Sequence, residues 1–449
     1  MGVQMFNAPP GNYIANIVVE QLYGEFSYEI GPAKEGADPR VLILYGSNGT
    51  GKSTILQLLR SILSPSNSAG HRNRIAQIPF KKFEVNFVNG QKISATREKE
   101  LYGSYLLSLS GGGSGSGSRV FIKVEPDGSV QTTHWPRSDQ EQFQKYLKDL
   151  SRISREVTYL DDKRTFSRAF ETDRVRARVR RNRIVHEGYI TETIEEEAED
   201  PVSSSVATLV DSIRRESLMR QRRGSGDSQY IYKNLISTLA KGTATVESSV
   251  EDLVFRLRQT EILSRELSVI GLISPLNNED VVRQLQDVAP ERREVVTDLV
   301  VAYVKSTEAW FSALKEIKSQ LDAFVDRLKF FMPQKSITFT VGDGLRIASK
   351  KNDKPLAISS LSSGERQLVM MLTQSLLRRN EAALMVIDEP ELSLNMKWQR
   401  ELVAAILECL GGGGSQVVFA THSIEIAARY RKNVERLWAQ GEDRNAKDD

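Results

Sequence analysis

The chain has 449 residues, of which 40% are hydrophobic and 27% charged, and its formal net charge is +3. A chain of this length exceeds the size at which one hydrophobic core stops growing, so we expect more than one structural unit, and the small net charge excludes nucleic-acid binding through overall charge. The single cysteine, Cys409, excludes an internal disulfide framework, and without a signal peptide or an apolar run of membrane-spanning length the sequence predicts a soluble, cytoplasmic protein that does not enter the membrane.

The N-terminal part alternates strand and helix patterns. Tyr13–Ile30 alternates apolar and polar residues, which predicts a strand or a hairpin, and Val41–Tyr45 is a continuous apolar run typical of a buried strand. Apolar residues at helical spacing follow in Ser53–Leu63. Two more strands, Phe83–Phe87 and Lys92–Thr96, are joined by an Asn-Gly pair, which favours a hairpin turn.

The next stretch carries weaker patterns. Gly111–Ser118 is a Gly/Ser-rich segment of low complexity and predicts a flexible linker, natural or introduced. Val120–Val124 and Ser129–Thr133 flank a Pro-Asp-Gly turn, which predicts a second hairpin, and Val157–Leu160 predicts a short strand.

From about Thr165 to Met332 the pattern is helical. The longest predicted helix begins near Pro290 and carries an apolar heptad seam, with Val250–Leu267 as its predicted partner helix. The seam consists of Val296, Val300, Tyr303, Thr307, Trp310, Leu314, Ile317, Leu321, Phe324 and Leu328. Arginines gather at positions 174–183 and again at 214–223, and acidic residues gather at 195–200.

The C-terminal part returns to strands. Ile337–Thr340 and Leu345–Ala348 predict a hairpin, and Leu384–Ile387 and Val417–Ala420 predict buried strands. The sequence therefore predicts an α/β fold whose α/β material lies at both ends of the chain, with a helical insertion between them.

A complete phosphate-loop pattern, G-x-x-x-x-G-K-[ST], occupies positions 46–53. Its glycines let backbone N–H groups converge on phosphate oxygens, Lys52 supplies charge to the β- and γ-phosphates, and the Ser53 hydroxyl binds Mg²⁺. An ordinary Gly-rich turn is the alternative, which the strand before the loop and the helix after it disfavour. The predicted ATP-binding residues here are Gly46, Ser47, Asn48, Gly49, Thr50, Gly51, Lys52, Ser53 and Thr54.

The strand Leu384–Ile387 ends in two carboxylates, Asp388 and Glu389. A buried strand that stops here places Asp388 in the crevice where α/β sheets bind ligands, so we predict that Asp388 holds Mg²⁺. Glu389 is the predicted general base for the attacking water. A strand ending in a solvated acidic turn is the alternative, which the phosphate loop makes less favoured.

Two further motifs complete the set. Leu361–Gln367 (LSSGERQ) predicts that Ser362, Gly364 and Glu365 lie at a helix N-terminus that attracts an anion, and a simple capping box of Ser362 and Glu365 explains it equally well. His422 directly follows the strand Val417–Ala420 and Thr421. The segment Glu391–Asn395 precedes the last of these strands.

In this order the motifs resemble those of ABC ATPases of the Rad50/SMC/RecF/OLD-like branch, which includes ATPase subunits of anti-phage defence systems. The resemblance implies a split P-loop ATPase head: an N-terminal lobe at 1–165, a helical or short coiled-coil insertion at 166–332, and a C-terminal lobe at 333–449. It also implies that Glu389, His422 and Lys52 are catalytic, with His422 contacting the γ-phosphate and the attacking water. Glu391–Asn395 resembles the D-loop, although Asn395 departs from the usual histidine. Gln77 and the region 159–164 are alternatives for the glutamine loop.

The resemblance further implies a head-to-tail homodimer, or a higher oligomer, in which Ser362 of one copy meets the ATP held by Lys52 of the other. ATP and Mg²⁺ are the implied cofactors. An ATP-driven conformational switch fits a DNA-related complex, with the arginine groups as DNA contacts or as a solvated face paired with Glu195–Glu197. It equally fits a scaffold or sensor that holds a separate effector, such as a nuclease, without touching DNA. A membrane-transporter subunit is disfavoured by the long insertion.

Overall fold

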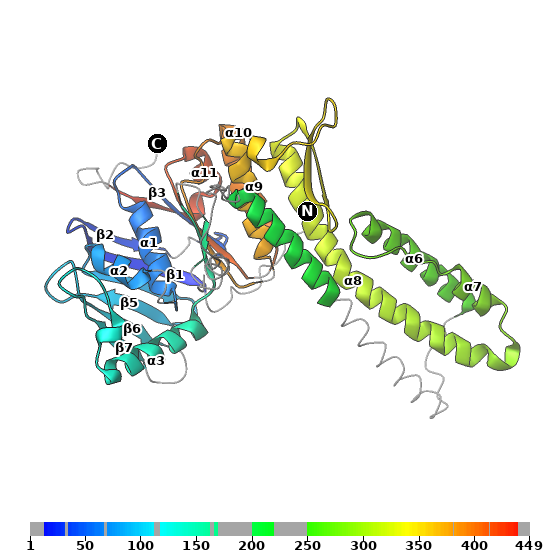
Figure 1. Cartoon of the computed structure of the whole chain (residues 1–449), viewed down its shortest axis with the longest axis horizontal. Coiled ribbons are helices and arrows are strands. Elements are labelled where there is room, and N and C mark those ends of the chain that lie inside the picture. The colour runs from blue at the N-terminus through cyan, green and yellow to red at the C-terminus, as the bar shows by residue number, and fades with distance from the viewer. Residues whose placement is uncertain are drawn as a thin grey trace, which may run out of the picture. The chain divides into compact units, whose positions relative to one another are not determined.

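The computed structural model describes most of the chain (Figure 1), at residues 13–31, 35–66, 70–111, 117–161, 166–168, 200–219, 249–379, 381–412 and 414–438. The chain forms two compact units. The first lies within residues 1–198, 378–404 and 410–449, and the second within 199–377 and 405–409. Among the described helices, none is both long enough and apolar enough to cross a membrane.

The first unit contains a mostly parallel sheet built from both ends of the chain. Its order is β14-β3-β13-β12-β8-β9, and only β8 and β9 pair antiparallel. The strands are β3 (Val41–Gly46), β8 (Val157–Leu160), β9 (Phe166–Arg168), β12 (Leu384–Asp388), β13 (Gln416–Thr421) and β14 (Val434–Leu437). Every residue of β12 and β13 is buried, which is why they are continuous apolar runs. Because strands from either side of the insertion interleave, the predicted α/β fold is confirmed.

A six-stranded antiparallel sheet forms the rest of the first unit's β-structure, with the order β2-β1-β4-β5-β6-β7. Its strands are β1 (Ile14–Leu22), β2 (Phe26–Ile30), β4 (Lys82–Phe87), β5 (Lys92–Thr96), β6 (Tyr105–Ser110) and β7 (Ser118–Ile122). Buried and less buried residues alternate along β4, as expected for a sheet with one face on the core. The hairpins β1–β2 and β4–β5 agree with the sequence prediction.

The predicted second hairpin is wrong. β7 pairs with β6, a strand that the sequence analysis missed, and residues 129–131 form no strand. The Pro-Asp-Gly turn does form, but the Val130 N–H then donates to the Asn73 side chain instead of a neighbouring strand. The chain continues through a short 3-10 helix, η1 (Thr132–His134), into a helix that was also not predicted, α3 (Arg137–Ile153).

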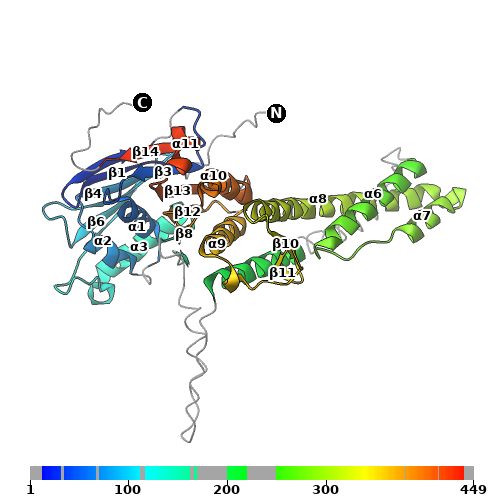
Figure 2. The same ribbon diagram turned by 90° about the horizontal axis from the view of Figure 1, so that it is seen from above.

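Helix α1 (Lys52–Leu63) lies between the two sheets of the first unit (Figure 2) and contacts both. One apolar core joins the antiparallel sheet, α1 and the parallel sheet. Two buried arginines cap helices, each without an ion pair to a carboxylate among the described residues. Arg72 donates to the carbonyls of Ser61 and Ser64 at the end of α1. Arg97 does the same for α2 (His71–Gln77). Favourable interaction of a cation with a helix C-terminus offsets part of the cost of burial. The unit also contains α11 (Ile424–Arg429), η4 (Arg431–Asn433) and the first part of α10 (Met396–Leu410).

The second unit is mainly helical. Residues 201–219 are helical, and α6 (Val250–Val269), α7 (Glu279–Gln286) and α8 (Arg293–Phe331) follow, with η2 (Pro290–Arg292) before α8. α8 confirms the predicted long helix, and α6 lies beside it in both views (Figures 1 and 2). Leu253 and Leu257 of α6 pack with Val300 and Val304 of α8 in a small core.

The predicted hairpin β10 (Lys335–Thr340) and β11 (Gly344–Ser349) is confirmed, and η3 (Ile358–Ser360) and α9 (Ser363–Leu377) complete the second unit. β10 and α9 both contact α8. The predicted lobe boundary near residue 333 therefore does not coincide with a boundary between the compact units. The arginines at 174–183 and 220–223, the acidic residues at 195–199 and most of the Gly/Ser-rich segment lie outside the described residues.

Candidate nucleotide site

The carboxyl ends of three neighbouring parallel strands bring the predicted site residues together. β3 ends at Gly46, β12 at Asp388 and β13 at Thr421, and the register pairs Asp388 with Ala420 and Thr421 with Tyr45. The phosphate loop, the two carboxylates and His422 therefore begin at one edge of one sheet, which is where open α/β sheets bind ligands.

The phosphate loop is held by its own side chains. The Lys52 ammonium donates to the carbonyls of Gly46 and Ser47, both at 2.7 Å, and the Thr50 hydroxyl donates to the Ser47 carbonyl. Gly46 must be glycine because a Cβ there would lie 2.5 Å from the Leu437 carbonyl oxygen of β14. Gly49 has a φ of +87°, which other residues rarely adopt, and open space faces its α-carbon. The loop is thus a narrow backbone turn with room for a ligand.

Lys52 is a buried cation among carboxylates, with 5% of the residue exposed. Burial lowers the pKa of its ammonium below the ordinary value, and the nearby carboxylates of Glu389, Asp388 and Glu391 oppose this shift in part. Because the buried ammonium is only partly hydrated, it is suited to bind a strongly charged ligand such as phosphate.

Ser53 and Asp388 supply oxygen ligands at the start of α1. The Ser53 hydroxyl donates to Asp388 Oδ1 at 3.1 Å, and the Tyr159 hydroxyl of β8 donates to Asp388 Oδ2 at 3.3 Å. Burial first, and then the charge of Asp388, raises the pKa of Tyr159, so its hydroxyl keeps its proton. Hydroxyl and carboxylate oxygens are the ligands that Mg²⁺ prefers, so Ser53 and Asp388 fit this ion.

Glu389 sits in a strained backbone conformation just beyond β12. Its φ is +47°, in the left-handed region, and its N–H donates to the Ala420 carbonyl at 2.9 Å. A non-glycine residue in this region costs about 1–3 kcal/mol, and such strain gathers at functional sites. The side chain is one-quarter exposed, so it can reach solvent or a ligand.

His422 contacts two acidic residues. Its Nδ1 lies 4.0 Å from Glu389 Oε1 and 3.1 Å from Glu391 Oε1. From the sequence, Glu391 is expected only in a D-loop-like segment, and its contact with His422 has no local signal because the two residues are 31 positions apart.

Two tyrosines of the β1–β2 hairpin also reach predicted ATP-binding residues and were missed. The hydroxyls of Tyr23, which follows β1, and of Thr54 lie 2.9 Å apart. The Tyr28 hydroxyl of β2 donates to the carbonyls of Thr50 and Trp438. An aromatic pattern in the first hairpin was the available signal.

The signature residues lie in the second unit, where they form a capping box. The Ser362 N–H donates to Glu365 Oε2 at 2.9 Å, and the Glu365 N–H donates to the Ser362 hydroxyl at 3.4 Å. Two ion pairs fasten the turn, from Lys335 of β10 to Glu365 and from Arg366 to Asp200. Burial alone would raise the pKa of Glu365, but the hydrogen bonds from Lys335 and Ser362 lower it below its usual value.

The remaining predicted positions have structural contacts. The Asn395 side chain accepts from the Trp398 N–H and caps α10. Of the two glutamine-loop alternatives, Gln77 ends α2 and is exposed, whereas Tyr159 touches Asp388, and residues 162–164 lie outside the described residues.

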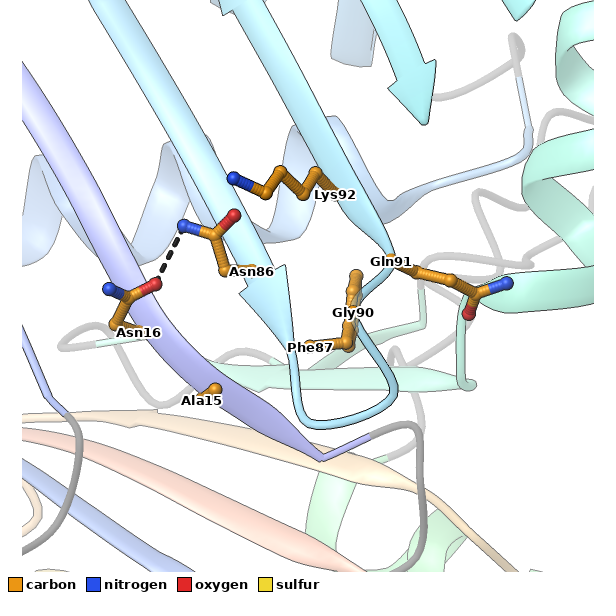
Figure 3. A pocket seen from close by; sticks show the side chains of 7 residues that line it. All are labelled: Ala15, Asn16, Asn86, Phe87, Gly90, Gln91 and Lys92. Carbon is orange, nitrogen blue, oxygen red and sulfur yellow. Dashed lines mark hydrogen bonds between the residues drawn. The ribbon is translucent and has the colours of Figure 1, made fainter. Parts of the chain in front are cut away.

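A separate hollow of about 260 Å³ lies on the antiparallel sheet (Figure 3). Asn86 of β4 donates to Asn16 of β1 within its lining, and Lys92 lies beside Asn86. None of its lining residues belongs to the predicted site.

Residues 137–428 match the model of a family described as "AAA domain, putative AbiEii toxin, Type IV TA system". The matched stretch includes Ser362, Asp388, Glu389 and His422 and leaves out the phosphate loop. No curated protein matches the chain.

Among solved structures, the chain is similar to the Smc head domain with an extended coiled coil, bound to the C-terminal domain of ScpA, from Pyrococcus furiosus. The identity is 14%, the TM-score is 0.39, and the match covers 94% of this chain and 95% of that one. The SMC head domain from Thermotoga maritima is 10% identical with a TM-score of 0.32, over 93% of this chain and 91% of that one.

Proposed function

The chain belongs to the AAA family whose model it matches over more than half of its length, and from this premise we propose that it hydrolyses ATP at a site completed by a second copy. Membership confirms the predicted resemblance to ATPases and supports ATP binding and hydrolysis in general terms. The observation that carries the detailed proposal is the convergence of Lys52, Ser53, Asp388, Glu389 and His422 at one sheet edge.

The phosphate loop binds the triphosphate. N–H groups at the start of α1 have no partner within the helix and attract anions, and Gly49 leaves the space that phosphate oxygens need. Lys52 exchanges its bonds to the loop carbonyls for bonds to phosphate oxygens. Ser53 and Asp388 hold Mg²⁺. When bound, this ion neutralises charge that develops on the phosphates.

Glu389 and His422 act on the attacking water. The Glu389 carboxylate accepts the proton that the water loses. The left-handed backbone of Glu389 fixes the direction in which its side chain leaves the main chain. His422, half exposed beside it, supplies a second polar contact to the water. Both residues follow strands of the same sheet, so their separation is set by strand register and not by loop motion.

The signature turn acts on the other copy. Ser362 and the N-terminus of α9 attract the γ-phosphate of ATP held by the partner's loop, so nucleotide joins two head-to-tail copies and hydrolysis releases them. The resemblance of the motifs to those of ABC ATPases is the basis for this step.

Mixing two inactive variants tests the shared site. Lys52→Ala removes the loop cation, and Ser362→Asp places a negative charge at the signature. In a head-to-tail dimer, half of the randomly paired dimers are mixed, and each has one intact composite site, so about a quarter of the wild-type ATPase rate returns. No recovery after subunit exchange, confirmed by mass photometry of tagged copies, would show that each chain hydrolyses ATP alone.

The family description names a putative toxin of a type IV toxin–antitoxin system, and we propose on that ground that the switch works in a two-component setting with a separate protein partner. Arg214, one of the arginines considered as DNA contacts, instead donates to the carbonyls of Val341 and Gly342. Purification of the native complex tests the effector, and salt-dependent filter binding tests DNA. A dimer that purifies without a partner protein and binds DNA at low salt would favour the DNA-related function instead.

A further inference from the structure

Glu391 is a buried carboxylate near Lys52, and the proposed contacts to phosphate and Mg²⁺ leave its role unassigned. It is 5% exposed, and it lies two residues beyond Glu389. A buried carboxylate is costly unless charged or hydrogen-bonding groups compensate it, so its contacts indicate what it is for.

One oxygen of Glu391 gathers the donors of a single turn. Oε1 accepts from the Thr421 hydroxyl at 2.6 Å, from the His422 N–H at 2.7 Å and from the Ser423 N–H at 3.1 Å. These donors span the junction of β13 and α11, where Ser423 caps the helix by accepting from the Ile426 N–H. The carboxylate therefore fixes the backbone that carries His422.

The same oxygen also faces the imidazole ring. His422 Nδ1 lies 3.1 Å from Glu391 Oε1, a charge contact, and 4.0 Å from Glu389 Oε1. Because a carboxylate only accepts, a close Nδ1 is favoured when it carries the proton. Nε2 is then left without a proton in the neutral ring.

We propose that Glu391 is a positioning residue for ATP hydrolysis: it holds the 421–423 turn and keeps the proton of neutral His422 on Nδ1. Nε2 is then the acceptor for one hydrogen of the attacking water, while Glu389 takes the other. This inference rests on the proposed role of His422 in hydrolysis.

Two substitutions separate the charge of Glu391 from its support of the turn. Glu391→Gln keeps an oxygen that accepts from the two backbone N–H groups, and its amide nitrogen replaces Oε2, which no donor contacts among the described residues. The turn survives while the attraction for an Nδ1 proton weakens. Thr421→Val does the reverse, because it removes one donor from the turn and leaves the carboxylate.

The readout is the tautomer of His422, measured by ¹⁵N NMR at pH 8 on histidine-labelled full-length protein. The chain has four histidines, so the His422 signals are assigned by their loss in His422→Ala. We expect the Nδ1–H form in the wild type and in Thr421→Val. In Glu391→Gln the ratio moves toward that of His134, an exposed histidine that serves as the internal reference. An unchanged tautomer in Glu391→Gln overturns the proposal.

Turnover supplies the second readout. Glu391→Gln lowers kcat about ten- to a hundredfold with KM for ATP little changed, the range seen when a residue that orients a metal-bound histidine is replaced. In a His422→Ala background the same substitution has no further effect, since Glu391 acts through His422. Glu425→Gln, which removes a one-quarter-exposed carboxylate on α11 paired with Arg400, leaves kcat unchanged. Equal losses in both backgrounds contradict the proposal. If His422→Ala keeps full turnover, the proposed role of His422 in hydrolysis is wrong. The tautomer measurement still tests whether Glu391 holds the proton of His422 on Nδ1.

Discussion

The phosphate-loop site and the signature turn differ in how they are built. The first joins residues from segments more than 300 positions apart, and it buries Lys52 and Asp388 and strains Glu389. The second is local: Ser362 and Glu365 satisfy each other within four residues at the start of a helix.

The difference shows which observations indicate function. The buried charges and the left-handed backbone of Glu389 both lower the stability of the folded chain, and the fold of the first unit needs neither of them. Binding of a ligand explains why they are present. The signature turn costs nothing, because a capping box stabilises a helix by itself. Its role toward nucleotide therefore needs a substitution that preserves the cap.

The largest effect is expected at the phosphate loop. Lys52→Ala should weaken ATP binding by about a hundredfold or more, because about 3 kcal/mol of charge-assisted hydrogen bonding to phosphate is lost. Isothermal titration calorimetry of the full chain measures it. Lys92→Ala, which removes an exposed lysine of the same unit (Figure 3), should bind ATP as the wild type does. If both variants bind ATP with the same affinity, Lys52 does not contact the nucleotide.

Ser362→Asp sharpens the comparison, since aspartate caps helices as well as serine does. If the turn is only a cap, the variant keeps both its stability and its ATPase rate. If the turn meets a γ-phosphate, the added negative charge repels it, and the rate falls about tenfold or more while the urea midpoint stays unchanged. Steady-state ATPase assays and urea unfolding on the same preparation distinguish the two outcomes.

Much of this architecture follows from local sequence signals. The glycine spacing of positions 46–53, the apolar runs of β12 and β13 and the heptad seam of α8 are each readable without tertiary information. α3 was missed although Phe143, Tyr146, Leu147 and Leu150 have helical spacing, so the signal was present.

Other features depend on which strands become neighbours. β7 carries a hairpin-like turn after it, yet it pairs with β6, because pairing is decided by the whole sheet. The contact between Glu391 and His422 exists only because β12 and β13 are adjacent and in register. No spacing in the sequence encodes that adjacency.

A smaller effect is expected at the ion pair that fastens the signature turn. Lys335→Met should lower the free energy of unfolding at pH 7 by about 1–2 kcal/mol, since both side chains are mostly buried. The pKa of Glu365 is depressed in the folded state, so its stabilisation is present above the ordinary value of 4.5 and is lost as the pH falls through the folded value. The difference between variant and wild type should therefore shrink toward pH 4.

Urea unfolding at pH 7 and pH 4 measures this prediction. Lys329→Met is the matched control, because Lys329 pairs with Asp326 on the surface of α8 and both side chains are at least half exposed. It should change stability by less than about 0.5 kcal/mol at either pH. A pH-independent loss in Lys335→Met would mean that its packing, and not its charge, supports the turn.

The smallest effect concerns Asn395, which resemblance places in a D-loop and the structure places at a helix cap. Asn395→Ala should cost about 1 kcal/mol, because the Trp398 N–H loses its side-chain acceptor and keeps only the Asn395 carbonyl at 3.0 Å. Asn395→Asp should cost little, since aspartate caps equally well. If position 395 is only a cap, kcat remains at the wild-type value in both variants, whereas a lower kcat in the stable Asp variant would assign Asn395 to the nucleotide site. The two substitutions at Asn395 therefore distinguish helix capping from a role in hydrolysis in the first unit, as Ser362→Asp does in the second.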